Sequence, residues 1–276
     1  MFQRILLFSI LSLFLFSCGE TQPKEKDATE KFADNAVDKN FQDKHATPKE
    51  IDFTPKGIKL EVPTLDGKMA SGYLLSSKEA SKNYLFVFHE WYGLNDHIKR
   101  ESERLHKELP NTNVIAIDLY DGKVASKPED AGKLMQSIST DRAKAIIEGF
   151  MASIGKDARI ATIGWCFGGG WSLQASILLE KQGIGCVIYY GSPVENAADL
   201  LPLEAEVLGL FAKKDAWVSP EKVEEFDALT KATGKNFSYK IFDADHAFAN
   251  PSGNRYEESA AQEANAMALE FLKKRL

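Results

Sequence analysis

The 276-residue chain has little cysteine and no excess of positive charge. Three cysteines are too few for the disulfide framework that stabilises small secreted domains. Lysine and arginine number 34 against 40 aspartates and glutamates, which gives a formal net charge of -6 at pH 7. The basic residues form no stripe that would follow a phosphate backbone, so we expect no nucleic-acid partner. Nothing in the sequence specifies an oligomeric state.

Apolar runs long enough to span a membrane comfortably are also missing. The run at residues 5–16 is too short, but it follows Arg4 and leads into Ser17-Cys18-Gly19, which fits a secretory signal. Its end resembles a bacterial lipobox. That resemblance implies a signal peptide over residues 1–18, lipidation of Cys18, and anchoring to a membrane of the cell envelope after export. An uncleaved anchor and a plain signal peptide are the alternatives.

Large apolar side chains are scarce in residues 19–54, which are rich in lysine, aspartate, glutamate, threonine and glutamine. A segment of that composition buries too little surface to offset its ordering entropy. We therefore expect a flexible tether, which includes His45. It would hold one folded domain, residues 55–276, near the membrane through the lipid anchor alone.

The remaining chain alternates short apolar runs with longer amphipathic segments. Two extended stretches around a turn at residues 65–68 predict an antiparallel hairpin over residues 58–76. Further strands are expected at 84–88, 114–119, 160–164, 187–190, 207–211 and 238–242, and helices at about 96–109, 129–153, 167–181, 220–232 and 256–274. Apolar strands that are each followed by a long helix are typical of a mostly parallel sheet covered on both faces. The sequence therefore predicts a three-layer α/β fold with its working groups beyond the carboxyl ends of the strands.

The strongest chemical signal is the sequence Gly-Trp-Cys-Phe-Gly-Gly at residues 164–169, between an expected strand and an expected helix. This is the nucleophile-elbow pattern of α/β-hydrolases, with cysteine where serine is usual. The turn lifts one side chain above the sheet edge and directs the N-terminus of the following helix at the sulfur, which favours a thiolate. Cys166 is therefore the candidate nucleophile. A glycine-rich turn with an incidental cysteine is the alternative.

A thiol nucleophile needs a base, and the base needs an orienting group. His246 follows the last expected strand, at the same sheet edge as Cys166. Asp215 follows the strand before it and completes the order nucleophile, acid, histidine. Asp243 and Asp245 are alternative acids, which we rank lower because neighbours of the histidine on an extended loop point in different directions.

The loop after the first central strand begins at His89 and normally donates an N–H to the oxyanion hole in this fold. The predicted backbone donors are therefore Trp91 and Phe167. His89 also ends a strand and is the alternative base.

Cys186 is expected to be a buried, free thiol. If its strand and the strand before Cys166 are parallel neighbours, Cys186 lies about 15 Å from the shared edge. A disulfide needs Cα atoms within about 7 Å of each other. A redox role for Cys166, which would require a second cysteine, is disfavoured for the same reason.

Together these motifs make the chain similar to the dienelactone hydrolase family, also called carboxymethylenebutenolidase-like proteins. The similarity extends from about residue 58 to the C-terminus and rests on residues 89–95, 118–120, 164–169, 215 and 246–248. It implies an α/β-hydrolase fold and hydrolysis of small esters or lactones by a triad of Cys166, Asp215 and His246. This chemistry requires no cofactor, and the sequence spacing shows no metal site.

The resemblance gives Glu90 a further role. In the family this glutamate interacts with the resting thiol and is displaced when substrate binds. A carboxylate near a thiol disfavours the thiolate, so the residue types are compatible with that role. The alternative is a loop carboxylate that only accepts hydrogen bonds from the backbone.

One position departs from the family pattern. Members that act on dienelactone hold the substrate carboxylate with arginines, one of them shortly after the catalytic histidine, where this chain has Asn250. Arg255 and Arg142 are the candidate replacements. Aromatic residues near the motifs indicate an apolar acyl or lactone pocket, unless several of them belong to the core: Trp91, Tyr92, Trp165, Phe167, Trp217 and Phe248.

The favoured hypothesis is therefore a hydrolase that forms a thioester at Cys166. A membrane-tethered binding lipoprotein that keeps the fold without turnover is the alternative. Retention of a nucleophile, an acid and a base in the required order favours the enzyme, because a binding protein has no need of all three.

Overall fold

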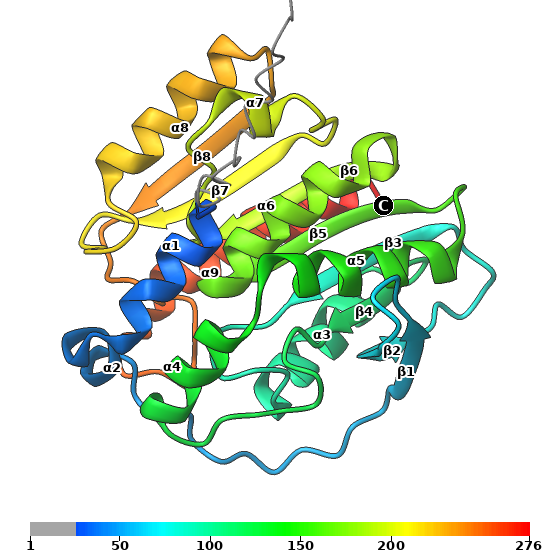
Figure 1. Cartoon of the computed structure of the whole chain (residues 1–276), viewed down its shortest axis with the longest axis horizontal. Helices are drawn as coiled ribbons and strands as arrows, with labels where there is room; N and C mark the ends of the chain where they lie inside the picture. Colours follow the sequence, from blue (N-terminus) through cyan, green and yellow to red (C-terminus); the bar gives the residue numbers. More distant parts are fainter. Residues whose placement is uncertain (1–25) are drawn as a thin grey trace, which may run out of the picture.

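The computed structural model of the protein describes residues 26–276, so the expected signal peptide and Cys18 lie outside the described residues. Its centre is an eight-stranded sheet in the order β1-β2-β4-β3-β5-β6-β7-β8 (Figure 1). The strands are β1 (Ile58–Pro63), β2 (Met69–Leu75), β3 (Asn83–Phe88), β4 (Asn113–Ile117), β5 (Arg159–Trp165), β6 (Gly183–Tyr189), β7 (Val207–Ala212) and β8 (Phe237–Phe242).

The sheet is antiparallel at one edge and parallel elsewhere. β1 and β2 form the predicted hairpin, with Val62 paired to Ala70 across it. β2 also runs antiparallel to β4, whereas β4, β3, β5, β6, β7 and β8 are parallel neighbours. All residues of β4 and β7 are buried, as strands covered on both faces should be. The predicted fold class is confirmed.

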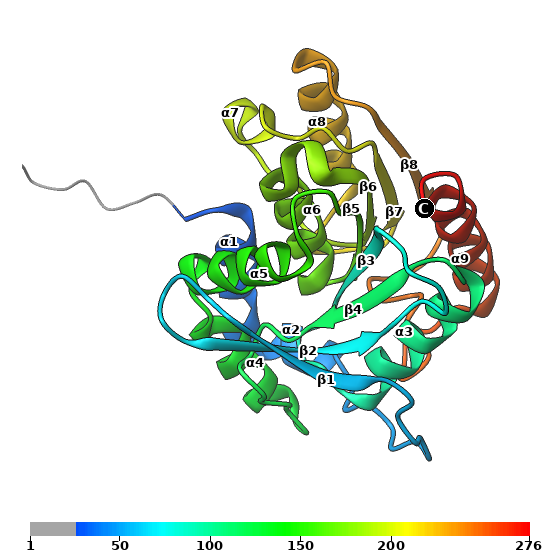
Figure 2. The same ribbon diagram turned by 90° about the vertical axis from the view of Figure 1, so that its right-hand side faces the viewer.

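Helices cover both faces of the sheet. Figure 2 shows α5, α6 and α8 on one face and α3 and α9 on the other. Within the described residues, none of these helices is both long and apolar enough to cross a membrane. The helices after β3 are α3 (Asp96–Glu108), α4 (Pro128–Ser137), α5 (Thr140–Ile154), α6 (Phe167–Leu179), α7 (Ala197–Leu200), α8 (Pro220–Ala232) and α9 (Glu258–Lys273), with a short 3-10 turn, η2 (Glu180–Gln182), after α6.

The single helix predicted over residues 129–153 is wrong, because the structure divides it into α4 and α5. The side chain of Ser139 accepts a hydrogen bond from the backbone N–H of Arg142 at 3.2 Å and so caps a new helix. Serine forms such caps readily, and Ile138 before it is extended. The local capping preference therefore overrides the continuous helical pattern.

Residues 26–54 differ from the flexible tether that their composition predicts. They form α1 (Ala28–Ala33), the 3-10 turn η1 (Asp34–Val37) and α2 (Lys39–Lys44). Phe32 and Phe41 are buried, and α1 packs against α4 and α6. The composition of the segment reflects only its own apolar surface. The folded domain supplies the other half of each contact, so a few apolar side chains are enough to dock the segment.

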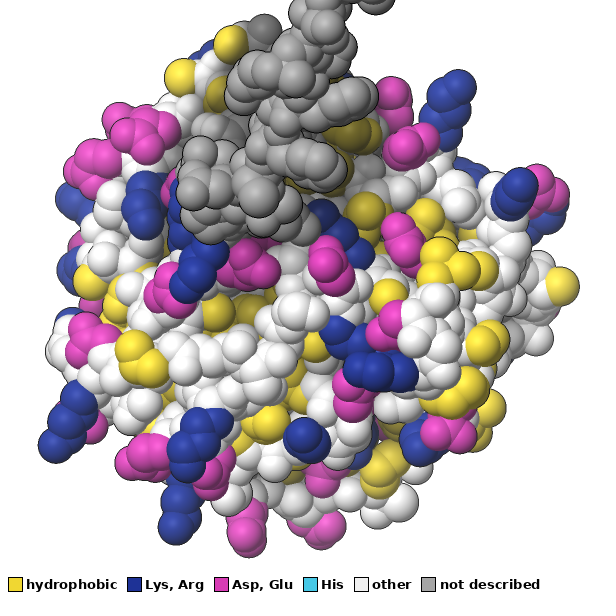
Figure 3. All heavy atoms as spheres, viewed as in Figure 1, with side chains coloured by type: hydrophobic (Ala, Val, Ile, Leu, Met, Phe, Trp, Pro, Cys, Tyr) yellow, Lys and Arg dark blue, Asp and Glu magenta, His cyan; other side chains and the backbone are white. Residues whose placement is uncertain are grey.

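Charges of both signs are mixed over the face seen in Figure 3, where lysine and arginine side chains lie beside aspartate and glutamate. Ion pairs elsewhere in the structure also combine both signs, such as Lys31 with Glu195 at 2.8 Å and Lys82 with Asp157 at 3.0 Å. This face therefore carries no broad patch of one sign.

Candidate active site

The turn between β5 and α6 holds Cys166 in a strained conformation. Cys166 has φ 55° and ψ −121°, in the left-handed half of the backbone map that residues with a side chain rarely occupy. A Cβ atom added to Gly164 would lie 2.0 Å from the carbonyl oxygen of Gly168, and one added to Gly168 would lie 2.4 Å from that of His89. The two glycines are therefore required for the close packing that supports the turn.

Four loops at one edge of the sheet carry the candidate residues. Glu90 follows β3, Cys166 follows β5, Asp215 follows β7 and His246 follows β8. These strands are parallel, so their carboxyl ends meet at the same edge. The structure thus brings together the four side chains that the sequence assigns to the site.

Asp215 fixes the orientation of His246. The Nδ1 atom of His246 lies 2.6 Å from Asp215 Oδ2, and both side chains are fully buried. The other carboxylate oxygen accepts hydrogen bonds from the backbone N–H groups of Trp217 and Val218, each at 2.9 Å. His246 Nε2 is buried and has no hydrogen-bond partner among the described residues. The imidazole is therefore held with one free nitrogen.

The other candidate acids and the alternative histidine lie elsewhere. Asp243 and Asp245 are exposed, and Asp243 pairs with Lys214 at 3.2 Å. His89 is buried, with Nδ1 2.7 Å from the carbonyl oxygen of Glu90 and Nε2 accepting from the Leu119 N–H. Both ring nitrogens of His89 are therefore engaged in holding loops together.

The surroundings of Cys166 favour a neutral thiol at rest. Burial raises the pKa of the Cys166 thiol well above its ordinary value, and the nearby Glu90 and Asp215 carboxylates raise it further. The backbone N–H of Phe167 opposes them by donating toward the sulfur. Phe167 is the first residue of α6, so this N–H has no acceptor within the helix. Proton removal from the thiol therefore requires a neighbouring base.

Two side chains donate hydrogen bonds to the carboxylate of Glu90. Its carboxylate accepts a short hydrogen bond from the Asn250 amide and another from the Tyr190 hydroxyl at 3.5 Å. Burial raises the pKa of Glu90 to about 7. Asn250, the position at which the resemblance implies an arginine, thus binds the Glu90 carboxylate in this chain.

The raised pKa of Glu90 predicts a pH-dependent stability. Its pKa rises from 4.5 to about 7 on folding. Protonated Glu90 therefore contributes its full stabilisation of the folded state below pH 4.5, and this stabilisation is lost as pH rises through 7. This difference corresponds to about 3 kcal/mol in the free energy of unfolding. We expect Glu90→Gln to remove that loss, as measured by urea unfolding at pH 5 and pH 8. The exposed control Glu79→Gln should keep the wild-type dependence, and an unchanged dependence in Glu90→Gln would contradict the burial argument.

The two candidate arginines have different surroundings. Arg142 is buried and forms ion pairs with Asp66 at 3.0 Å and Asp121 at 2.5 Å, so it holds the β1–β2 hairpin and does not line the cavity at Cys166. Arg255 lines that cavity, and its guanidinium lies 5.4 Å from the ring centre of Trp217. It forms no ion pair within the described residues. Arg255 is therefore the arginine available to an anion near the sulfur.

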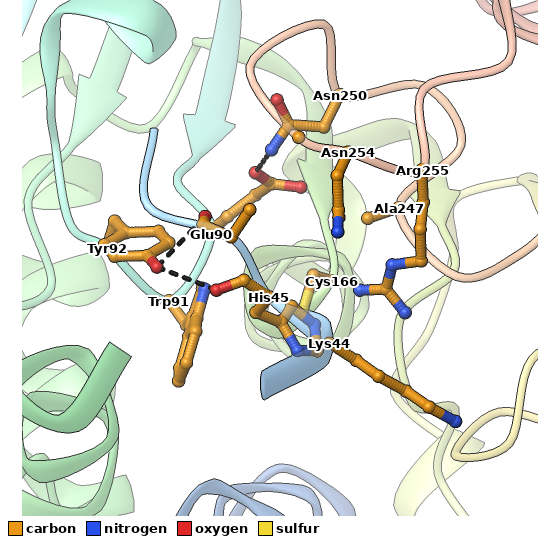
Figure 4. Close-up of a pocket in the computed structure, with 12 residues that line it drawn as sticks. Lys44, His45, Glu90, Trp91, Tyr92, Cys166, Ala247, Asn250, Asn254 and Arg255 are labelled. Carbon is orange, nitrogen blue, oxygen red and sulfur yellow. Dashed lines mark hydrogen bonds between the residues drawn. The ribbon is translucent and has the colours of Figure 1, made fainter. Parts of the chain in front are cut away.

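The segment after α2 covers Cys166, which sequence reasoning missed. Figure 4 shows His45 and Lys44 beside Cys166, with the guanidinium of Arg255 directed toward it. His45 stacks on Phe41 with ring centroids 4.1 Å apart, and the Tyr92 hydroxyl donates to the carbonyl oxygen of His45 at 3.1 Å. A histidine in a polar stretch far from every motif gives no signal of this placement.

Two cavities adjoin the site. The one at Cys166 has a volume of about 20 Å³, room for about one water molecule. A larger cavity of about 390 Å³ shares Glu90, Tyr92 and Asn250 with it. Trp165 and Tyr256 also line the larger cavity, whereas Phe167 and Phe248, expected near an acyl pocket, are buried in the core.

Cys186 is a free, buried thiol, as expected. It lies opposite Thr162 in the register of β5 and β6, four residues before Cys166 along the strand direction. Its sulfur lies 3.6 Å from the Ser172 hydroxyl. The two cysteines are therefore not bridged, and Cys186 belongs to the helix–sheet packing.

Known proteins resemble this chain over most of its length. The sequence profile of the dienelactone hydrolase family matches residues 70–276. Protein usf of Aquifex pyrophilus is 26% identical over 239 residues, covering 82% of this chain and 98% of that protein. Carboxymethylenebutenolidase 1 of Cupriavidus pinatubonensis is 25% identical over 228 residues, covering 77% and 95%. The crystal structure of the dienelactone hydrolase-like promiscuous phosphotriesterase P91, from metagenomic libraries, has the same fold, with a TM-score of 0.67 at 19% identity over 79% of this chain and 98% of that one. The chain therefore belongs to the dienelactone hydrolase family and has the fold of a hydrolase.

Proposed function

We propose that the protein hydrolyses small carboxylic esters or lactones through a thioester at Cys166. The observation that carries this proposal is the buried Asp215–His246 pair beside Cys166, in which Nε2 of His246 has no partner among the described residues. One ring nitrogen of His246 and the sulfur lie within 4.8 Å of each other. Since Nδ1 is bonded to Asp215, the nitrogen available to the thiol is Nε2.

The proposed reaction has two halves. In the first, His246 takes the thiol proton while the sulfur of Cys166 attacks the substrate carbonyl, and the proton then passes to the departing alkoxide. The result is a thioester and a free alcohol, which stays on the same molecule when the substrate is a lactone. In the second half, His246 takes a proton from water, which attacks the thioester and releases the carboxylic acid and the thiol.

Backbone groups would stabilise the oxyanion in both halves. Phe167 offers an N–H of the first turn of α6 that has no acceptor within the helix and lies next to the sulfur. Trp91 follows Glu90 in the loop after β3 and lines the same small cavity. We assign these two N–H groups to the oxyanion hole because they come from the two loops that supply it in this fold.

Substrate access would depend on Glu90. The small cavity at Cys166 has no room for an ester, whereas the larger cavity of about 390 Å³ is also lined by Glu90. That volume is within the usual range for small-molecule sites. We infer that the substrate binds in the larger cavity and displaces the Glu90 carboxylate, which removes a negative charge from beside the thiol.

Arg255 predicts a preference for substrates with a carboxylate. A charge-assisted hydrogen bond contributes about 1.5–3 kcal/mol, so Arg255→Gln should raise KM about 10- to 100-fold for an anionic ester or lactone. The neutral substrate 4-nitrophenyl acetate should keep its KM. Arg159→Gln, at the opposite edge of the sheet where β5 begins, is the matched control. Equal losses on charged and neutral substrates would contradict the assignment of Arg255.

A binding protein with the same fold remains the second candidate, favoured by the closed cover over Cys166. A panel of esters and lactones of different charge distinguishes the two. Turnover of any member that depends on Cys166 supports the hydrolase. Saturable binding without turnover across the panel supports the binding protein.

We also propose that the chain is exported and lipidated at Cys18, on the strength of the apolar run and the lipobox-like sequence before it. Mass spectrometry of the protein isolated from membranes of a bacterial host should find a diacylglyceryl-modified Cys18 at the mature N-terminus. Cys18→Ala should leave an unmodified protein. An unmodified cysteine in the wild-type chain would contradict the lipobox interpretation.

A further inference from the structure

The N-terminal segment places a second histidine against the nucleophile. His45 is 6% exposed and lies just after α2, with its ring centre 5.4 Å from that of His246. One ring nitrogen of each histidine and the Cys166 sulfur all lie within 4.8 Å of one another. The proposed reaction uses Cys166 and His246, but it leaves His45 without a role.

Hydrogen bonds fix the tautomer of both rings. His45 Nδ1 lies 2.6 Å from the carbonyl oxygen of Phe41, an acceptor, so Nδ1 carries the proton. Nδ1 of His246 is held in the same way by Asp215. Each Nε2 therefore bears a lone pair, and both Nε2 atoms are buried without a partner among the described residues.

This arrangement is the one that metal-binding histidines adopt. Such a histidine donates its second ring N–H to a carboxylate or a backbone carbonyl and presents the other nitrogen to the ion. Asp215 supplies the carboxylate for His246, and Phe41 supplies the carbonyl for His45. A buried nitrogen without a partner is unfavourable. Two of them next to one thiol therefore form a set of three donor atoms suited to a metal ion.

We propose that His45, Cys166 and His246 bind a divalent transition-metal ion, with Zn²⁺ the best match, and that the ion fastens the N-terminal segment over the nucleophile. One thiolate and two imidazoles suit the borderline-soft Zn²⁺, and the fourth tetrahedral position would take a water molecule. Metal–ligand bonds of about 2.0–2.3 Å place ligand atoms about 3.5 Å apart. The three atoms, now within 4.8 Å, would need to close by about 1 Å.

Charge balance is compatible with this ion. Binding releases the thiol proton to solvent and leaves a thiolate on the metal, because a coordinated thiol is deprotonated outright. The positive charge of Arg255 would repel the bound metal ion, whereas the carboxylates of Asp215 and Glu90 would attract it. All three groups interact electrostatically with the Cys166 sulfur. Sequence spacing gave no indication of the site, because its ligands come from residues 45, 166 and 246.

Cobalt titration of the chelator-treated full-length chain tests the site without any catalytic readout. We expect one Co²⁺ per chain and a thiolate-to-cobalt charge-transfer absorption that Zn²⁺ displaces. His45→Ala and His45→Asn should each weaken Co²⁺ binding at least about tenfold, and Cys166→Ala should abolish the absorption. His106→Ala, at a half-buried histidine on α3, and Cys186→Ser should bind as the wild type does. Thermal unfolding of each variant checks that it is folded.

Failure of the wild-type chain to bind stoichiometric Co²⁺ would overturn the proposal. Binding by both His45 variants as tight as that of the wild type would do the same. A second readout rests on the proposed function: Zn²⁺ should inhibit ester hydrolysis reversibly, with EDTA restoring it. If the chain hydrolyses no ester at all, the proposed function fails, whereas the cobalt titration still decides whether the metal site exists.

Discussion

Cys166→Ala should lower kcat/KM for 4-nitrophenyl acetate by about 10⁴-fold or more, which is the scale of loss when a catalytic nucleophile is removed. The reason is that the sulfur forms the bond to the acyl group, and no other nucleophilic side chain occupies the tip of the turn after β5. Background hydrolysis by water, helped only by the oxyanion hole, would remain. The measurement is initial-rate kinetics at matched protein concentration.

Cys186→Ala is the matched control for this substitution. Cys186 is also a buried free thiol, but it lies within β6 on the Ser172 side of the sheet and takes no part in the proposed reaction. Its removal should leave kcat/KM unchanged. Esterase activity that survives Cys166→Ala at the wild-type level would show that another residue is the nucleophile.

Asp215→Asn should lower kcat by about 10⁴-fold with a small change in KM, because it reverses the tautomer of the histidine. The backbone N–H groups of Trp217 and Val218 both donate to one oxygen of Asp215. They would hold the amide oxygen of the asparagine in that place and turn its NH₂ group toward His246. Nδ1 would then accept a hydrogen bond, and the proton would move to Nε2, where the base must be free.

Asp243→Asn is the control for this prediction, since Asp243 is exposed and pairs with Lys214 instead of His246. It should leave kcat unchanged. A loss of less than about tenfold in Asp215→Asn, in a variant that unfolds at the wild-type temperature, would mean that the Asp215–His246 contact is structural.

The sequence was sufficient to predict the fold class. It also predicted that Glu90, Cys166, Asp215 and His246 lie at one edge of the sheet. Parallel strands point their carboxyl ends the same way, and each of these residues lies in the loop that follows such a strand. The glycines at 164 and 168 marked the turn for a similar reason, since only glycine fits against the backbone there. Local patterns were enough wherever the site depends on local geometry.

The N-terminal segment could not be predicted in that way. Phe41 is buried against Trp91 and Trp217, with ring centroids 5.3 and 4.8 Å away, so its partners come from two distant loops. Composition within residues 19–54 carries no information about those partners. The role of Asn250 was hidden for a related reason, since its contact with Glu90 joins loops that follow β8 and β3.

The docked segment changes the functional interpretation. A flexible tether would only position the domain, whereas an ordered segment with His45 beside Cys166 and His246 limits access to Cys166. The raised pKa of Cys166 indicates that the resting site holds a neutral thiol. Reactivity would then require that the substrate displace Glu90.

Detection of the thioester tests most directly whether Cys166 is the nucleophile. The wild-type chain is mixed with a 4-nitrophenyl ester, quenched in acid during the first turnover, digested and analysed by mass spectrometry. We expect the acyl group on the peptide that contains Cys166, and we expect Cys186 to be unmodified. Release of nitrophenol in that first turnover with Cys166 unmodified, or with the acyl group on another residue, would contradict the assignment of Cys166 as the nucleophile.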